Sequence, residues 1–237
     1  MKESKTTFAY FVQHMTEPSF EKVRNISCDF VKRLSSDLVD ALFDQLNRGI
    51  EILDSEPLLQ MYFYSYGQMH AEKMMYAFKQ LSPYIKSAKK IDIIDYGCGQ
   101  GLATICYHDF LKDYNLKQQV RTIILIEPSA LALSRAELLC NHFFPEATIT
   151  AIQKDFDELL EDEIRIGADC PTLHLFSNIL DIESFEIPLL ANKIKASCQG
   201  DNDFVLVSPL QSASRIGRLT EFVEYLGIDY YFKFRKY

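Results

Sequence analysis

The sequence predicts an α/β fold: a doubly wound, mostly parallel sheet with helices on both faces, preceded by an N-terminal helical subdomain. From residue 91 onward, short apolar runs alternate with helix-forming stretches, which is the pattern of parallel βαβ units. Before residue 90, apolar residues recur near the helical period. We therefore expect a helical lid or extension at 1–90 and the sheet domain at 91–237.

The composition is that of a globular protein with a real core. Of 237 residues, 48% are hydrophobic and 24% are charged, and the net charge is −8. An acidic balance argues against broad nucleic-acid binding, which needs a basic face. The six cysteines form no C-x-x-C pair, so we expect neither a disulfide framework nor a metal site. Without a signal peptide or an apolar run of membrane-spanning length, the expected location is cytoplasmic, with no membrane partner.

Start signals divide the N-terminal region into helices. Thr16-Glu17-Pro18 offers a cap and an early proline, Ser36 is a second cap candidate before a stop near Gly49, and Ser55-Glu56-Pro57 begins a third helix. The third helix runs to about Leu81, with Gly67 as a point that would loosen it.

The sheet domain is predicted to contain six strands. They are 91–95, 121–126, 147–152, 172–176, 203–208 and 230–235, with helices at 101–114, 129–141, 156–162, 183–197 and 213–226.

The densest signal is the run from Ile91 to Gly101. An apolar stretch typical of a buried parallel strand ends in Asp95, and glycines follow at 97, 99 and 101. Glycine has no Cβ and tolerates positive φ, so such a turn lets a ligand lie against bare backbone at a helix N-terminus. A tight turn without a ligand is the alternative.

The glycine spacing distinguishes two kinds of cofactor. A dinucleotide site is G-x-G-x-x-G with an acid about 20 residues further on, whereas here Glu127 ends the next strand 26 positions after Gly101. The run from Asp95 to Gly101 instead resembles the first motif of the class I S-adenosylmethionine-dependent methyltransferases, which have a Rossmann-like fold. This family has a seven-stranded sheet, so a seventh strand is missing here. Either the chain is a truncated piece, or the N-terminal helices or a second copy in a homodimer complete the edge.

The resemblance implies a set of residues that bind S-adenosyl-L-methionine. Gly97, Gly99 and Gly101 would admit it, Asp95 would reach toward its amino group, and Glu127 would accept hydrogen bonds from its ribose hydroxyls. Pro128 would flank the adenine, and Asp155 and Phe156 would contact it. Each acid has a plainer alternative: Asp95 as a turn-stabilising carboxylate, Glu127 as a solvated strand end and Asp155 as a helix cap.

Polar residues follow the fourth predicted strand, where chemistry lies in open α/β sheets. Ser177 would lie near the cofactor, and Asn178 and Asp181 are the candidate catalytic residues, although caps at a strand–helix junction are the alternative. Family members that methylate amides, adenine or amines carry N/D-P-P-Y here, and this chain does not. His174, in mid-strand, is expected to be a core residue.

Two further groups could border the site. Tyr66 and His70, at i and i+4 on one helix face, are the predicted lid contacts to the cofactor, against the alternative of plain packing. Arg215 and Arg218 could meet an anionic acceptor, or they could be a solvated helix face.

These patterns predict a methyltransferase acting on a small molecule or a protein side chain. A non-catalytic cofactor-binding regulatory subunit, or another nucleotide-cofactor enzyme on the same scaffold, is the alternative.

Overall fold

The computed structural model describes residues 7–49, 51–209 and 213–228. Its centre is a sheet of five parallel strands in the order β3-β2-β1-β4-β5. The strands are β1 (Lys90–Tyr96), β2 (Gln119–Ile126), β3 (Thr148–Ile152), β4 (Thr172–Ser177) and β5 (Asn202–Val207). The doubly wound α/β prediction is confirmed. The predicted strand at 230–235 lies outside the described residues.

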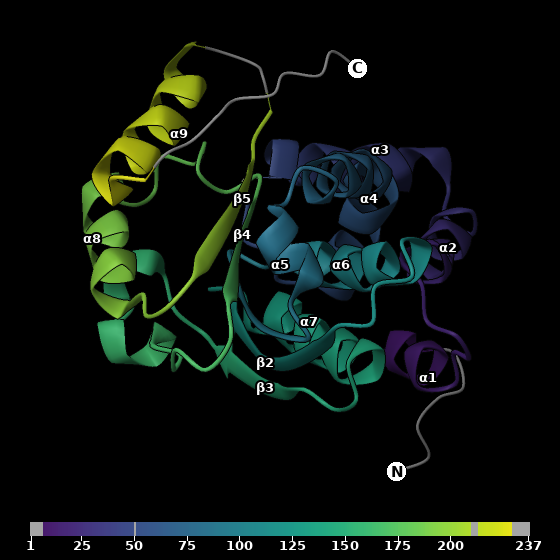
Figure 1. Cartoon of the computed structure of the whole chain (residues 1–237). Helices are drawn as coiled ribbons and strands as arrows, with labels where there is room; N and C mark the ends of the chain where they lie inside the picture. Colours follow the sequence, from purple (N-terminus) through teal and green to yellow (C-terminus); the bar gives the residue numbers. More distant parts are fainter. Residues whose placement is uncertain (1–6, 50, 210–212, 229–237) are drawn as a thin grey trace.

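Helices cover both faces of the sheet (Figure 1). One face carries α4 (Glu56–Phe78), α5 (Pro83–Ser87), α6 (Leu102–Asp113) and α7 (Ala130–Phe143), and the other carries α8 (Ile187–Ser197) and α9 (Ala213–Leu226). The helices α1 (Phe8–Gln13), α2 (Phe20–Val31) and α3 (Ser36–Gln45) pack outside α4 and α7. No helix in the described ranges is both long and apolar enough to cross a membrane.

Alternation along β1 explains the two cores. Ile91 and Ile93 point into the cluster under α4, α6 and α7, whereas Ile94 and Tyr96 point into the cluster under α8 and α9. Successive strand residues face opposite sides, and a parallel sheet is buried on both. The first cluster also contains Phe63, Met74 and Phe78 of α4, so the N-terminal helices share a core with the sheet. A separate lid at 1–90 stays a prediction.

The third predicted N-terminal helix begins after Ser55 as predicted, whereas the first two begin at other residues. Ser19, not Thr16, caps α2, because its side chain accepts the Lys22 backbone N–H at 3.3 Å while Glu17 adopts a φ of 50°. Ser35 occupies the cap position of α3. The helix α4 runs unbroken through Gly67, and the Phe20 ring of α2 packs beside it. A Cβ at this position would meet Phe63 and Phe20 at 3.4 and 3.5 Å, which are ordinary van der Waals distances.

Two helices of the sheet domain differ from those that the sequence predicts. The predicted helix at 156–162 is wrong: two 3₁₀ turns, Phe156–Glu158 and Glu161–Ile164, flank an extended Leu159. This break buries Phe156, Leu159 and Ile164 in one cluster. The helix predicted from 183 begins at Ile187. Pro188 lies in its first turn, where a residue without a backbone N–H is tolerated.

Candidate functional site

The glycine turn follows β1 at the point where the strand order reverses. The chain winds from β1 outward to β3 and then returns to β4 on the other side of β1, so the carboxyl ends of β1 and β4 form the switch point at which open α/β sheets place their ligand crevice. Gly97, Gly99 and Gly101 all have φ between 52° and 78°, in the left-handed region that favours glycine. The sequence therefore places its least hindered backbone at the crevice.

The three glycines meet different surroundings. A Cβ at Gly97 would lie 2.5 Å from the Ile179 side chain, and one at Gly101 would lie 3.2 Å from Ala136 of α7. A Cβ at Gly99 would meet no atom within 4 Å. Packing thus explains Gly97 and Gly101, whereas Gly99 borders open space in which a ligand could reach the backbone.

Asp95 lies beneath the turn with one oxygen unused. Its Oδ2 accepts the Thr104 hydroxyl at 2.7 Å, while its Oδ1 is buried and has no hydrogen-bond partner among the described residues. Burial raises the pKa of this carboxyl to about 7, against the lowering effect of the Thr104 hydrogen bonds and with a further raising effect from Glu127. Buried polar atoms are normally paired, so the free oxygen favours a ligand donor at this position.

The raised pKa of Asp95 predicts a pH dependence of stability. Between about pH 4 and pH 7 the folded protein holds a proton that the unfolded chain has lost, so the free energy of unfolding falls as pH rises through this window, by on the order of 4 kcal/mol. In Asp95→Asn this contribution is absent, and urea unfolding at several pH values should give a flatter profile. The exposed Glu158→Gln serves as the control. A slope unchanged by Asp95→Asn would contradict the prediction.

Glu127 organises the turn from the end of β2. Its Oε2 accepts the Gly99 N–H and its Oε1 accepts the Ser129 N–H, both at 3.0 Å. Burial raises the pKa of this carboxyl, and the two backbone hydrogen bonds oppose that rise. Each carboxylate oxygen can accept more than one hydrogen bond, so Glu127 keeps acceptor capacity for hydroxyl groups. Half-buried Pro128 follows it.

Asp155 and Phe156, which lie a few residues beyond the end of β3, have different surroundings. Asp155 is exposed, makes no capping hydrogen bond to the 3₁₀ turn that follows it, and adds to the raising of the pKa of Glu127. Phe156 is buried in the α8-side core, with its ring 4.8 Å from that of Phe185. The structure therefore brings Asp155 toward the glycine turn, while Phe156 packs in the interior.

The exit of β4 reaches the same crevice. Asn178 adopts a φ of 59°, donates its backbone N–H to Val207 at 2.7 Å and donates its amide to the half-buried Ser177 hydroxyl at 3.2 Å. Asp181 is half-buried nearby. Left-handed φ at a residue other than glycine is uncommon and clusters at functional sites. His174, further back in the strand, is a core residue as predicted, bonded to Tyr96 and Asn202.

The helix α4 carries aromatic and basic side chains that reach the exit of β4. The rings of Tyr66 and His70 stack with centroids 6.1 Å apart, and the Tyr62 hydroxyl lies 3.4 Å from His70 Nδ1. Burial lowers the pKa of His70 to about 3, with the charge of Lys73 adding to the effect, so this histidine is neutral. Lys73 donates to Asn178 Oδ1 at 3.2 Å. The pair Tyr66 and His70 thus lies with two residues that the sequence did not single out as site residues.

Tyr62 interacts electrostatically with acidic residues on two sides of the site. Burial raises the pKa of its phenol, and the charges of Glu127 and Asp181 both add to that rise. Its ring therefore lies within electrostatic reach of the end of β2 and of the loop after β4. The signal that could have found Tyr62 and Lys73 is their spacing from Tyr66 and His70, which places all of them along one side of α4.

A buried arginine ties the glycine turn to the N-terminal helices. Arg135 of α7 donates to Gln100 Oε1 at 2.8 Å and pairs with Glu56 at the start of α4, and its guanidinium lies 3.9 Å from the centroid of the Phe8 ring. Gln100 in turn donates to the Leu59 carbonyl at 3.0 Å. These contacts hold the turn, α1, α4 and α7 as one unit, and no local motif indicated them.

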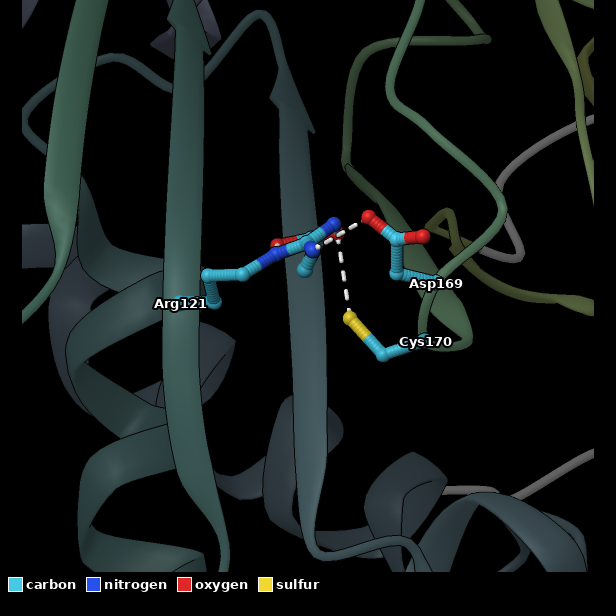
Figure 2. A network of polar contacts seen from close by, with 4 residues as sticks. Arg121, Asp169 and Cys170 are labelled. Atoms are coloured by element: carbon cyan, nitrogen blue, oxygen red, sulfur yellow. Dashed lines mark hydrogen bonds and ion pairs between the residues drawn. The ribbon is translucent and has the colours of Figure 1, made fainter.

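The opposite end of the sheet carries a second polar network, built around the buried Asp92 (Figure 2). Arg121 of β2 binds both oxygens of fully buried Asp92 at 3.0 and 2.6 Å and also contacts Asp169, while the Cys170 thiol donates to Asp92. Asp92 lies near the start of β1 and the glycine turn follows its end. This network therefore supports the sheet away from the candidate site.

Arg218 is half-buried, and its guanidinium group is bound by backbone carbonyls. It donates to the carbonyls of Leu180, Ile182 and Phe185 at 2.6–3.0 Å, so it fixes the loop between β4 and α8. The side chain of Arg215 lies outside the described part of the molecule. Two surface hollows, one between α4 and α6 and one lined by the loop after α6, contain none of the predicted site residues.

Comparisons with known proteins find likeness at the level of structure only. No family model and no curated protein matches the sequence. Among solved structures, the chain is similar to a Listeria monocytogenes protein provisionally described as a class I S-adenosylmethionine-dependent methyltransferase (13% identity, TM-score 0.43, 92% of this chain and 75% of that one). It is also similar to an S-adenosylmethionine-dependent methyltransferase of Leishmania major (12%, 0.44, 84% and 79%).

A third similar structure is a complex of the Haloferax volcanii Trm112 methyltransferase activator with a methyltransferase (12% identity, TM-score 0.40, 72% of this chain). The chain spans 59% of the length of that match. With TM-scores of 0.40 to 0.44, these likenesses carry no conclusion about the chain, and its fold is taken from its own strand order. The chain has a Rossmann-like α/β fold, and the solved structures it is similar to are described as methyltransferases, the family that its glycine motif resembles.

Proposed function

We propose that this chain is an S-adenosylmethionine-dependent methyltransferase whose acceptor is a small molecule or a protein side chain. One observation carries the proposal: the open backbone at Gly99 lies near the half-buried carboxylate of Glu127 and the buried carboxyl group of Asp95, and Asp95 has an oxygen without a partner among the described residues. An adenosyl ligand with a cationic amino-acid end matches this arrangement, because it offers hydroxyl groups to Glu127 and a charged donor to Asp95.

We assign the site residues to a cofactor end and an acceptor end of the crevice. At the cofactor end, Gly97–Gly101 admit the ligand and Glu127 accepts its ribose hydroxyls, with Pro128 and Asp155 beside the adenine. When bound, S-adenosylmethionine supplies an electrophilic methyl group on a sulfonium. Phe156, buried as it is, would contribute by shaping the pocket from below.

At the acceptor end, the chain orients the nucleophile and excludes water. Ser177 and Asn178 present hydroxyl and amide groups at the end of β4, and Asp181 is placed to take a proton from an acceptor that must lose one. Tyr66 and His70 close the crevice from α4, and neutral His70 offers one donor or acceptor nitrogen without adding charge. Water exclusion by such a lid strengthens the electrostatic contacts inside.

Titration calorimetry tests the cofactor assignment. S-adenosylhomocysteine should bind to the full chain with a stoichiometry of one, and NADH should not compete with it. Tighter binding of NADH would move the chain to another cofactor class. Transfer of label from methyl-labelled S-adenosylmethionine to a component of a cell extract, by the purified chain, would exclude a role as an inactive regulatory subunit. A cytoplasmic location and a homodimer stay predictions.

A matched pair of ligands tests Glu127. In Glu127→Gln one acceptor oxygen becomes a donor facing a backbone N–H, so we expect affinity for S-adenosylhomocysteine to fall by about tenfold or more. The 2′-deoxyribose analogue should bind the wild-type protein more weakly than S-adenosylhomocysteine, and the two should become nearly equal in the variant. If the preference for the 2′-hydroxyl survives in Glu127→Gln, Glu127 is not the ribose ligand.

A further inference from the structure

We propose that Lys73 is the anion-binding group of the acceptor pocket, and that the acceptor is a small organic acid presenting an anionic oxygen, a carboxylate or a phenolate, to this ammonium. The inference rests on the proposed function, because it takes the acceptor to lie beyond the carboxyl end of β4. It adds a residue that the glycine motif does not indicate and a chemical class of substrate.

The position of Lys73 is set by two elements far apart in the sequence. It projects from α4 and donates to Asn178 Oδ1 at 3.2 Å, across 105 positions of sequence. Asn178 is held with a φ of 59° by its backbone hydrogen bond to β5 and directs its amide oxygen at the ammonium. The next residue, Ile179, packs against Gly97, so the Lys73–Asn178 pair and the glycine turn are neighbours at the carboxyl end of the sheet.

The surroundings leave the ammonium short of polar partners. Lys73 is half-buried, and burial lowers its pKa more than the nearby charge of Asp181 raises it. A lysine ammonium has three N–H donors, so it can hold the neutral amide of Asn178 and a ligand oxygen together. An anionic oxygen would offset the loss of hydration more fully than a neutral group, because hydrogen bonds between charged groups are the stronger ones.

Charge in the loaded site favours an anion over an amine. An acceptor lying between the glycine turn and Lys73 has the sulfonium on one side and the ammonium on the other. A protonated amine there would be repelled by both, whereas an anionic oxygen would be attracted by both. Asp181 is the group that could reverse this preference by pairing with an amine, so the experiment must compare the two classes directly.

The neighbouring groups along α4 add no net charge. His70, one turn before Lys73, is neutral, and the Tyr62 phenol, whose hydroxyl lies 3.4 Å from His70 Nδ1, stays protonated because burial raises its pKa. Together with Tyr66 they offer ring faces for the apolar body of an acid. Aromatic acids are therefore suitable probes.

Calorimetry on the full chain saturated with S-adenosylhomocysteine tests the inference without turnover. The probes are benzoate, 4-nitrophenolate, benzamide and benzylamine, and the first two distinguish a carboxylate from a phenolate. The variants are Lys73→Met, Lys73→Arg and Lys79→Met; Lys79 is the exposed cap residue just after α4, so it controls for the loss of one positive charge. Thermal unfolding and S-adenosylhomocysteine affinity report whether each variant is folded.

We expect one of the two anions to bind saturably, about tenfold or more weakly in Lys73→Met, and near the wild-type affinity in Lys73→Arg and Lys79→Met. Benzamide should bind weakly in every variant. The inference is overturned if benzylamine binds better than both anions, if neither anion binds, or if Lys73→Met changes nothing. Failure of S-adenosylhomocysteine itself to bind would instead contradict the proposed function.

Discussion

In Gly99→Arg, binding of S-adenosylhomocysteine should be lost while the protein stays folded. A Cβ at position 99 meets no atom within 4 Å, so the added side chain projects into the open space that the ligand would need. Blocking this space should cost more than about 3 kcal/mol of binding free energy, which is more than about 100-fold in Kd. Titration calorimetry measures the loss, and thermal unfolding measures the remaining stability.

The φ of 52° at Gly99 adds a cost of its own, since a residue other than glycine in the left-handed region loses about 1–2 kcal/mol. Gly227→Arg controls for this strain: Gly227 has a φ of 66° just after α9, and the nearest atom to its added Cβ is the flexible Lys195 Nζ at 3.5 Å. That variant should lose similar stability and keep ligand affinity. Unchanged affinity in Gly99→Arg would show that the ligand does not lie against this turn.

In Arg135→Met, both stability and ligand affinity should fall. The variant leaves Gln100 without its buried donor and Glu56 without its partner, and it removes the cation from the Phe8 ring. Glu56 is half-exposed and can rehydrate, so we expect a loss of about 2–3 kcal/mol in the free energy of unfolding rather than the 3–5 kcal/mol typical of a fully buried pair. Because Gln100 lies inside the glycine turn, affinity for S-adenosylhomocysteine should also weaken, by about tenfold.

The matched control is Arg121→Met at the other end of the sheet (Figure 2). It leaves Asp92, which is fully buried, without its guanidinium partner, and should cost about 3–5 kcal/mol in urea unfolding. Its folded fraction should bind the ligand normally, because the pair lies near the start of β1. If both variants lose affinity only in proportion to their unfolding, Arg135 is structural and does not position the turn.

The sequence indicated those parts of the molecule that short stretches of chain determine. The strand β1 is apolar on both faces, and the glycines at 97, 99 and 101 all adopt the positive φ that their spacing predicted. The acid at the end of β2 faces the turn through the Gly99 N–H. These features depend on backbone sterics and on the period of side chains, and both can be recognised within about ten residues.

Local patterns misled where burial decided the conformation. The stretch 156–162 has helix-forming residues, but an extended Leu159 allows it and Phe156 to enter the same core. Asp155 as a helix cap and Gly67 as a point that loosens α4 were local interpretations as well. The structure shows no capping bond at Asp155, and α4 runs unbroken through Gly67. Helical propensity differs by only tenths of a kcal/mol per residue, which is less than the burial of one large apolar side chain.

What the sequence determined by itself was the crevice: a buried strand, a turn of bare backbone and an acid on the neighbouring strand. What only the tertiary structure decided was how that crevice is enclosed. Lys73 meets Asn178, and Arg135 meets Gln100 and Glu56, across 35 to 105 positions of sequence. The physical reason is that such contacts arise when helices pack on a sheet and exclude water, so the residues that make them carry no periodic or local signature before the chain has folded.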